Sequence, residues 1–241
     1  MRKPLLVGLL IVGTLLTPIR ASAAPPRVPI LLYHHIAYGY GLYFVSQWRL
    51  EQQLIYLSTN GYHSISLSNY LDTLEYGLAL PDKPVILTFD DGYRDAYENA
   101  YPLLEKYHMV GTFFIITGQV GDPAYMTWDQ IRSMQQAGME IGSHTVHHAF
   151  LTRLWIVNAI AEMLQSRFDL QAHLKTPINF FAYPYNDHNW LLAWIARLVG
   201  YRAACIVTPF KNDPAGDSFL LPRLPMLPME DMQSFALAVA E

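Results

Sequence analysis

Residues 85–93 read VILTFDDGY, an apolar run that ends in two adjacent carboxylates and a glycine. The apolar part, residues 85–89, predicts a buried strand. Two neighbouring carboxylates at such a strand end repel each other unless a cation or hydrogen bonds compensate their charge. Because adjacent strand residues face opposite sides, Asp90 and Asp91 serve one site only if the chain turns at Gly92. The stretch fits either an ordinary turn or a catalytic pair in which one aspartate binds a metal and the other acts as a base.

The rest of the chain repeats this pattern of short apolar runs, each followed by a longer amphipathic segment. The alternation predicts an α/β fold, a mostly parallel sheet or barrel with helices outside it. The expected strands are residues 29–33, 85–89, 111–116, 140–143, 179–182 and 203–207. Apolar residues at helical spacing predict two helix faces that point into the core. These are Leu50, Leu54 and Leu57 on one helix, and Val157, Ala161, Leu164 and Phe168 on another.

The chain begins with two basic residues after Met1, a stretch of apolar residues (5–16) and three small ones (21–23). This order is typical of a secretory signal peptide. It predicts that residues 1–23 are removed and that residues 24–241 form one exported domain, secreted or periplasmic. An uncleaved membrane anchor is the alternative, but about 12 apolar residues fall short of the roughly 20 that span a bilayer.

The net charge limits the possible partners, and the single cysteine limits the possible disulfides and catalytic thiols. The net charge of −4 becomes more negative once the basic N-terminal segment is removed, which argues against nucleic acid as a partner. Cys205 is the only cysteine, so no internal disulfide can form. Its apolar neighbours predict a buried strand residue rather than a catalytic thiol. No stable membrane span is expected in the mature chain, and the sequence leaves the oligomeric state open.

A second polar cluster, GSHTVHH at residues 142–148, directly follows another apolar run. Barrels of this kind gather catalytic groups at the C-terminal ends of their strands. His144 and His148 converge on one ion if the segment makes a helical turn, with His147 as the alternative ligand. One carboxylate and two imidazoles would leave coordination positions open for water and substrate, as in a catalytic zinc site. Zinc suits this ligand set, and cobalt, nickel or iron fit it as well.

The motifs TFDDGY (88–93) and SHTVHH (143–148) resemble the two metal-site motifs of the polysaccharide deacetylase family, the NodB-homology carbohydrate esterases. Further stretches match that family in order and spacing: LLYHHI (31–36), GTFFI (111–115), MTWDQI (126–131), GMEIGSH (138–144), FAYPYN (181–186) and LLPR (220–223). The similarity spans nearly all of the mature chain. It looks closest to the branch that acts on poly-β-1,6-N-acetylglucosamine, a biofilm exopolysaccharide. The resemblance implies a distorted (β/α) barrel, circularly permuted in that branch.

The resemblance also implies roles for single residues. The family's metal ligands match Asp91, His144 and His148, and the implied cofactor is one divalent ion, zinc by preference. Asp90 matches the general base. The backbone N–H of Tyr185 matches the group that helps to stabilise the oxyanion.

Two departures from the family's pattern matter. Many relatives carry an arginine that orients the base where this chain has Ala182, and Arg223 is the candidate to replace it. Many relatives also place the general acid in a Leu-x-His near the C-terminus, which is missing here. Because the permutation moves this motif to the front of the chain, His34 is the expected acid and His188 a rival. Alternatively, His34 and His35 are only strand-end residues bonded to a loop.

Together these features predict metal-dependent hydrolysis that removes N-acetyl groups from N-acetylglucosamine units of an extracytoplasmic polysaccharide. Peptidoglycan, chitooligosaccharide and xylan are alternative substrates. A glycan-binding protein without activity is the alternative outside enzymes. Aromatic residues that could stack on sugar rings near the site are Tyr38, Tyr40, Tyr43, Trp155 and Trp190.

Overall fold

The computed structural model describes residues 27–208, 216–228 and 231–240. The signal peptide predicted at residues 1–23 lies outside the described residues. The strands are β1 (Ile30–Tyr33), β2 (His35–Ile36), β3 (Phe44–Val45), β4 (His63–Ser64), β5 (Pro84–Phe89), β6 (Thr112–Ile115), β7 (Glu140–Ser143), β8 (Phe180–Ala182), β9 (Ala203–Val207) and β10 (Leu221–Pro225). The helices are α1 (Gln47–Thr59), α2 (Leu67–Tyr76), α3 (Tyr101–Lys106), α4 (Trp128–Gln136), α5 (Ile156–Leu174), α6 (Trp190–Val199) and α7 (Met232–Ala240). None of the described helices has the length and apolarity to cross a membrane.

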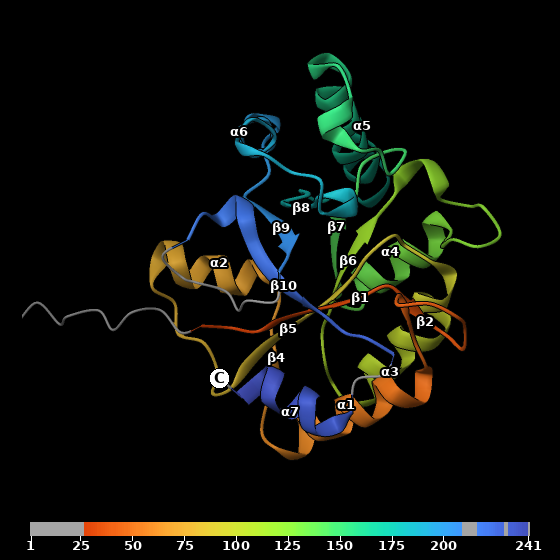
Figure 1. Cartoon of the computed structure of the whole chain (residues 1–241), viewed down its shortest axis with the longest axis vertical. Coiled ribbons are helices and arrows are strands. Elements are labelled where there is room, and N and C mark those ends of the chain that lie inside the picture. Colours follow the sequence, from red (N-terminus) through yellow and green to blue (C-terminus); the bar gives the residue numbers. More distant parts are fainter. Residues whose placement is uncertain (1–26, 209–215, 229–230, 241) are drawn as a thin grey trace, which may run out of the picture.

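Seven parallel strands form a closed barrel (Figure 1). Their order is β1-β10-β9-β8-β7-β6-β5, and the pairing of β5 with β1 closes the ring. The short strand β4 pairs with β5 outside this ring. Helices surround the strands, with α5 and α6 at the top of Figure 1 and α1, α3 and α7 at the bottom. The predicted distorted (β/α) barrel is confirmed. Because the strands run in one direction, their carboxyl ends lie at one end of the barrel.

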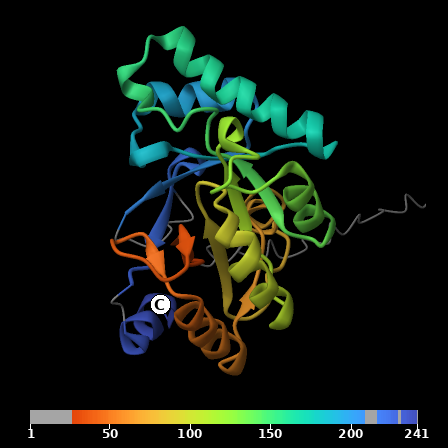
Figure 2. The same cartoon turned by 90° about the vertical axis from the view of Figure 1, so that its right-hand side faces the viewer.

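The first strand, β1, lies between the last strand and the strand that carries the aspartates. Leu31 of β1 pairs with Leu224 of β10 on one side and with Leu87 of β5 on the other. The LLYHHI motif therefore ends beside the two aspartates that follow β5. The β2–β3 pair, which comes directly after β1, lies in front of the barrel in Figure 2.

All six predicted strands are present, with bounds that differ from the predicted ones by at most one residue. The strand β10 is not predicted, because it contains Pro222 and Pro225. Proline has no N–H to donate to a sheet and normally argues against a central strand. Other donors complete the ladder here: the N–H of Thr208 donates to the carbonyl of Arg223 at 3.1 Å.

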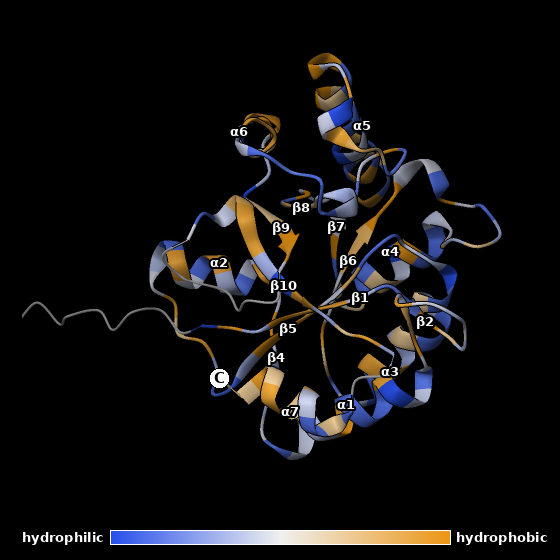
Figure 3. Cartoon of the chain, in the orientation of Figure 1, coloured by the Kyte–Doolittle hydropathy of each residue, from blue (hydrophilic) through white to orange (hydrophobic). Residues whose placement is uncertain are grey.

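Alternate strand residues face two separate cores. Leu87 of β5 belongs to the larger core, together with buried residues of most of the surrounding helices. Its neighbour Ile86 belongs to a smaller core with Tyr70 of α2. The strands at the centre of Figure 3 are accordingly coloured mostly as hydrophobic. Cys205 lies in the smaller core, where burial raises the pKa of its thiol to about 12, so it is the buried strand residue that the sequence predicts.

The predicted core face of α1 is confirmed, and that of α5 is wrong. Leu50, Leu54 and Leu57 are fully buried. The predicted face of α5 points instead to solvent: Val157, Ala161, Leu164 and Phe168. Its buried side chains are Ala159, Met163, Ser166, Leu170 and Leu174. The helix carries two apolar stripes, and periodicity finds a stripe without telling which one meets the barrel.

Adjacent substitutions on α5 test this orientation. Met163→Ala empties a fully buried position, and we expect it to lower the free energy of unfolding by about 2–5 kcal/mol. Leu164→Ala removes a side chain that is 50% exposed, and we expect a change of no more than about 0.5 kcal/mol. Urea unfolding followed by circular dichroism measures both values. Equal losses would contradict the orientation of α5.

Candidate active site

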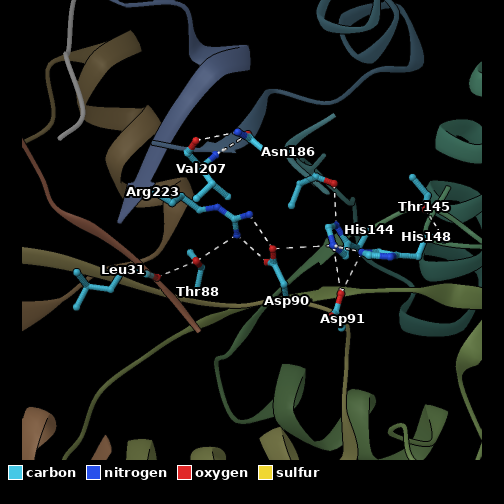
Figure 4. Close-up of polar contacts among 11 residues, drawn as sticks. Leu31, Thr88, Asp90, Asp91, His144, Thr145, His148, Asn186, Val207 and Arg223 are labelled. Atoms are coloured by element: carbon cyan, nitrogen blue, oxygen red, sulfur yellow. Dashed lines mark hydrogen bonds and ion pairs between the residues drawn. The ribbon is translucent and has the colours of Figure 1, made fainter. Parts of the chain in front are cut away.

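The two aspartates stand in a tight turn at the end of β5. The N–H of Asp90 donates to the carbonyl of Tyr33 at 2.9 Å, which extends the β1–β5 ladder by one residue. The backbone is then left-handed at Asp91 (φ 74°) and Gly92 (φ 81°). The turn thus begins one residue before the predicted Gly92. A left-handed conformation is unfavourable for aspartate, but it brings both carboxylates to the same end of the barrel (Figure 4).

Arg223 of β10 binds Asp90 through two parallel hydrogen bonds. Nη1 donates to Oδ1 at 2.6 Å and Nη2 donates to Oδ2 at 2.7 Å. Both residues are withdrawn from solvent, with Arg223 0% and Asp90 3% exposed. Nη1 also donates to Thr88 Oγ1 at 3.3 Å. A guanidinium therefore contacts this aspartate even though the family's usual position for it holds Ala182.

The two neighbouring carboxylates are compensated by different partners. Burial alone would raise the pKa of Asp90, but the charge and hydrogen bonds of Arg223, together with the nearby His144 and His34, outweigh burial and lower it. Burial is likewise outweighed at Asp91, where the adjacent His144 lowers the pKa. Both carboxyl groups are ionised at neutral pH. The repulsion expected from the sequence is thus offset on each side by its own cationic or hydrogen-bonding neighbour.

The two histidines come together through a loop that is not helical. Thr145 (φ 66°) and His148 (φ 54°) are left-handed, which corrects the predicted helical turn. Thr145 Oγ1 accepts from the N–H of His148 at 2.9 Å. Glu162 of α5 accepts from both the N–H and the Nδ1 of His147, at 2.9 and 2.7 Å, and turns that side chain outward. The alternative ligand His147 is therefore directed away from the aspartates, whereas His144 faces them.

Three atoms converge at the centre of the site, Oδ1 of Asp91 and the Nε2 atoms of His144 and His148. The two nitrogens are 3.2 Å apart and lie 3.4 and 3.3 Å from the oxygen. Ligands about 2.0–2.1 Å from a tetrahedral zinc ion lie about 3.3 Å from one another, so these atoms match three corners of such a site. Oδ1 of Asp91 is also buried without a hydrogen-bond partner. The residues present fit a divalent cation.

Hydrogen bonds and burial prepare both imidazoles as ligands. Nδ1 of His144 donates to the carbonyl of Ala182 at 2.8 Å, which directs Nε2 toward the centre. Burial and the neighbouring His144 lower the pKa of His148 to about 4, so this ring is neutral at neutral pH. Burial lowers the pKa of His144, but the charges of Asp90 and Asp91, together with the bond to the Ala182 carbonyl, outweigh burial and the net direction is upward. A cation at the centre competes with that proton, because a ligand nitrogen must be deprotonated.

A cleft of about 690 Å³ adjoins this cluster and includes the two remaining site residues that the sequence predicts. His34 lines it and packs against the ring of Tyr43, with centroids 4.7 Å apart. Burial lowers the pKa of His34, although the charges of the aspartates oppose that shift. Tyr185 (φ 57°) lies over His148 and stacks on Phe150 at 3.9 Å. His34 and Tyr185 thus both line the cleft beside the three converging atoms.

The turn at Tyr185 is held by the next residue. Asn186 Nδ2 donates to the carbonyl of Val207 at 2.9 Å, and the N–H of Val207 donates to Asn186 Oδ1 at 2.8 Å. These two bonds tie the turn to β9. They hold the backbone of the turn, and the tyrosine ring adds its own contacts with Phe150 and His148.

Some predicted residues lie elsewhere, and some residues of the cleft were not predicted. His188 bonds to the carbonyl of Asn186 at 2.7 Å and is not part of the cleft lining. Of the five aromatic residues predicted near the site, Tyr43 alone lines the cleft. The lining also includes Tyr93 and Tyr125, which the sequence analysis did not single out. Their positions in the sequence could have indicated them, because Tyr93 directly follows the aspartate turn and Tyr125 directly precedes the MTWDQI motif.

Comparison with known proteins agrees with this architecture. A model of the polysaccharide deacetylase family matches residues 78–204. The chain belongs to this family. YxkH of Bacillus subtilis (strain 168), named as a polysaccharide deacetylase, is 34% identical over 187 residues, 77% of this chain and 66% of that protein.

Two further relatives carry more specific names. The poly-β-1,6-N-acetyl-D-glucosamine N-deacetylase of Staphylococcus aureus (strain MSSA476) is 27% identical over 196 residues, 76% of this chain and 67% of that protein. The solved structure of the deacetylase PplD of Streptococcus pyogenes, in complex with acetate, superimposes with a TM-score of 0.85 at 29% identity, covering 89% of this chain and 99% of that one. The chain spans about two thirds of the length of the curated relatives.

The buried pair of Arg223 and Asp90 generates a stability prediction. Arg223→Met leaves the carboxylate buried without a partner, and we expect a loss of about 3–5 kcal/mol in the free energy of unfolding. Adding Asp90→Asn removes the unpaired charge and is expected to restore most of that loss. Urea unfolding of the two single variants and the double variant measures the coupling. A loss below about 1 kcal/mol for Arg223→Met would show that the pair is not the buried contact described here.

Proposed function

We propose that this chain is a metal-dependent N-deacetylase that removes N-acetyl groups from N-acetylglucosamine units of an exported polysaccharide, with poly-β-1,6-N-acetylglucosamine as its substrate. The observation that carries the proposal is the ionised carboxylate of Asp90 next to the three converging atoms of Asp91, His144 and His148. A base beside a cation site suits hydrolysis, and binding alone has no need of it. The substrate is supported by the name of the Staphylococcus aureus relative.

In this proposal Asp91, His144 and His148 hold the cation. Zinc is preferred by this ligand set, and cobalt, nickel or iron are the alternatives. When bound, the ion would polarise the acetyl carbonyl and lower the pKa of a water molecule. Three protein ligands leave room for water and substrate beside them.

The other residues move protons and stabilise charge. Asp90, kept ionised and oriented by Arg223, accepts a proton from the attacking water. Attack on the acetyl carbon gives a tetrahedral oxyanion, to which the backbone N–H of Tyr185 donates. The loss of one such donor typically costs roughly 3–4 kcal/mol. His34 then protonates the departing nitrogen, so that the C–N bond breaks and the products are an amine on the sugar and acetate.

The missing arginine at Ala182 would support the alternative of an inactive glycan-binding protein, because the base would then lack the guanidinium that orients it. The bidentate contact from Arg223 removes that support, because the base has its guanidinium from another strand.

We also propose that residues 1–23 act as a signal peptide that directs the domain at 24–241 out of the cytoplasm. N-terminal sequencing of the protein recovered from the medium or periplasm tests this.

Histidine variants test the metal assignment. His144→Ala removes one of three ligands, and we expect zinc affinity to fall by at least about tenfold, since even the loss of an outer hydrogen bond costs that much. His147→Ala is the matched control, because this side chain is 73% exposed and bonded to Glu162. We expect it to keep zinc affinity at the wild-type level. Titration with zinc after chelation measures both, and equal effects would contradict the ligand set.

Acetate release tests the function itself. Chelated protein is reloaded with zinc and incubated with poly-β-1,6-N-acetylglucosamine, peptidoglycan, chitooligosaccharide or acetylated xylan. We expect the fastest release from the first of these. Asp90→Asn is expected to keep its zinc and to lose about 10²–10⁴-fold in rate, because it lacks the base. Faster release from another polymer would change the substrate, and no release from any of them would refute the enzyme.

A further inference from the structure

Four histidines line the cleft, and one of them, His35, is firmly held but has no part in the proposed chemistry. Its Nδ1 bonds to Asp95 Oδ2 at 2.6 Å, and Asp95 Oδ1 accepts from the N–H of Ile36 at 3.0 Å. Asn99, in the short π-helix of residues 96–100, donates to the carbonyl of Ile36 at 2.7 Å. The segment after the aspartate turn thus fixes β2 and its imidazole in place.

The ring of His35 is also clamped between two aromatic rings. Phe44 stacks on it with centroids 4.2 Å apart and planes 4° apart, and Tyr93 stacks on it at 3.6 Å and 18°. Two nearly parallel rings at these distances occupy opposite faces of the imidazole. Tyr93 stacks in turn on Tyr125 at 5.1 Å. All four rings line the cleft, so the imidazole presents only an edge to it.

The atom left at that edge is Nε2. Asp95 Oδ2 accepts the hydrogen bond from Nδ1, so the tautomer with a single ring proton carries it on Nδ1 and leaves Nε2 as an acceptor. Within the part of the chain that the structure describes, no side chain or backbone group donates to this atom. The His35 side chain as a whole is 22% exposed, and its Nε2 is not among the buried atoms without a partner, so the ring is open to solvent. An acceptor fixed in an open cleft without a protein partner suits a donor on a ligand.

We propose that His35 is a glycan-binding residue whose Nε2 accepts a hydrogen bond from a hydroxyl group of the polysaccharide. The proposal rests on the proposed function and adds a recognition contact to it. The ring is locked by Asp95, Phe44 and Tyr93, and proton transfer stays with its neighbour His34. Because the contact is the same before and during attack on the acetyl group, its loss raises KM and leaves kcat almost unchanged.

Two variants separate the acceptor atom from the aromatic stack. His35→Phe keeps a ring between Phe44 and Tyr93 and removes Nε2. His35→Gln removes the ring and keeps an acceptor oxygen on a side chain of similar reach. We expect His35→Phe to raise KM for a β-1,6-linked N-acetylglucosamine pentamer by about 3- to 10-fold, the effect of one neutral hydrogen bond, with His35→Gln closer to wild type. A purely structural role for the ring predicts the opposite order and would overturn the proposal.

The matched control is His173→Phe. His173 also stacks on an aromatic ring, that of Trp128, at 3.8 Å and 5°, but neither residue lines the cleft. We expect this variant to keep the wild-type KM and kcat. A larger loss for His35→Phe on the pentamer than on 4-nitrophenyl acetate, an acetyl ester without a sugar, assigns the effect to glycan recognition. Equal losses on both substrates would overturn that assignment.

A binding measurement separates this proposal from the proposed function. The fully deacetylated pentamer keeps the ring hydroxyl groups and has no acetyl group to lose, so calorimetry measures its affinity for the zinc-loaded wild type and for His35→Phe. Affinity that is about 3- to 10-fold weaker in the variant supports the contact. Equal affinity overturns the role of His35 and leaves the enzyme proposal intact. If the wild type neither binds the pentamer nor releases acetate, the proposed function falls and this inference falls with it.

Discussion

The site depends on one buried interaction, the bidentate contact between Arg223 and Asp90. These residues belong to β10 and to the end of β5, and β1 is the strand that joins the two across the closed barrel. A charge withdrawn from water without a partner costs several kcal/mol, so the loss of either group alone destabilises the closed barrel. The same contact keeps the proposed base ionised. The stability of the barrel and the orientation of the proposed base therefore both depend on this pair of side chains.

This pairing also explains how two adjacent carboxylates can differ in role. Asp90 has its charge balanced by the guanidinium, and Asp91 has an unpartnered Oδ1 that faces two imidazole nitrogens. A cation at the centre would therefore be drawn to Asp91 and would leave Asp90 free to accept a proton. The left-handed backbone at Asp91 makes this division possible, because in a regular strand the two side chains would face opposite sides of the barrel wall.

Much of the barrel and the identity of the central residues could be predicted from the sequence, because apolar runs with polar residues at their ends are local patterns. The predictions that failed concern features that depend on contacts between distant parts of the chain. The strand β10 could not be predicted, because its prolines argue against a strand in the local sequence. Only its pairing with β1 and β9 in the folded barrel shows that it is one. The face of α5 was misassigned because two apolar stripes compete and the barrel decides between them. The partner of His35 could not be predicted, because Asp95 lies 60 residues away and meets it only in the folded barrel.

Backbone strain is concentrated where the proposed chemistry takes place. Among the described residues, eight other than glycine have a positive φ, and five of these lie in the loops after β5, β7 and β8: Asp91, Thr145, His148, Tyr185 and Asn186. A left-handed conformation at such residues costs about 1–3 kcal/mol each, so the local sequence alone would not maintain it. Contacts with the barrel and α5 hold it instead, through Glu162 for the histidine loop and Val207 for the tyrosine turn. The strain is useful because ligand atoms and backbone donors that are fixed before the substrate arrives need no rearrangement as charge develops on the attacked carbonyl.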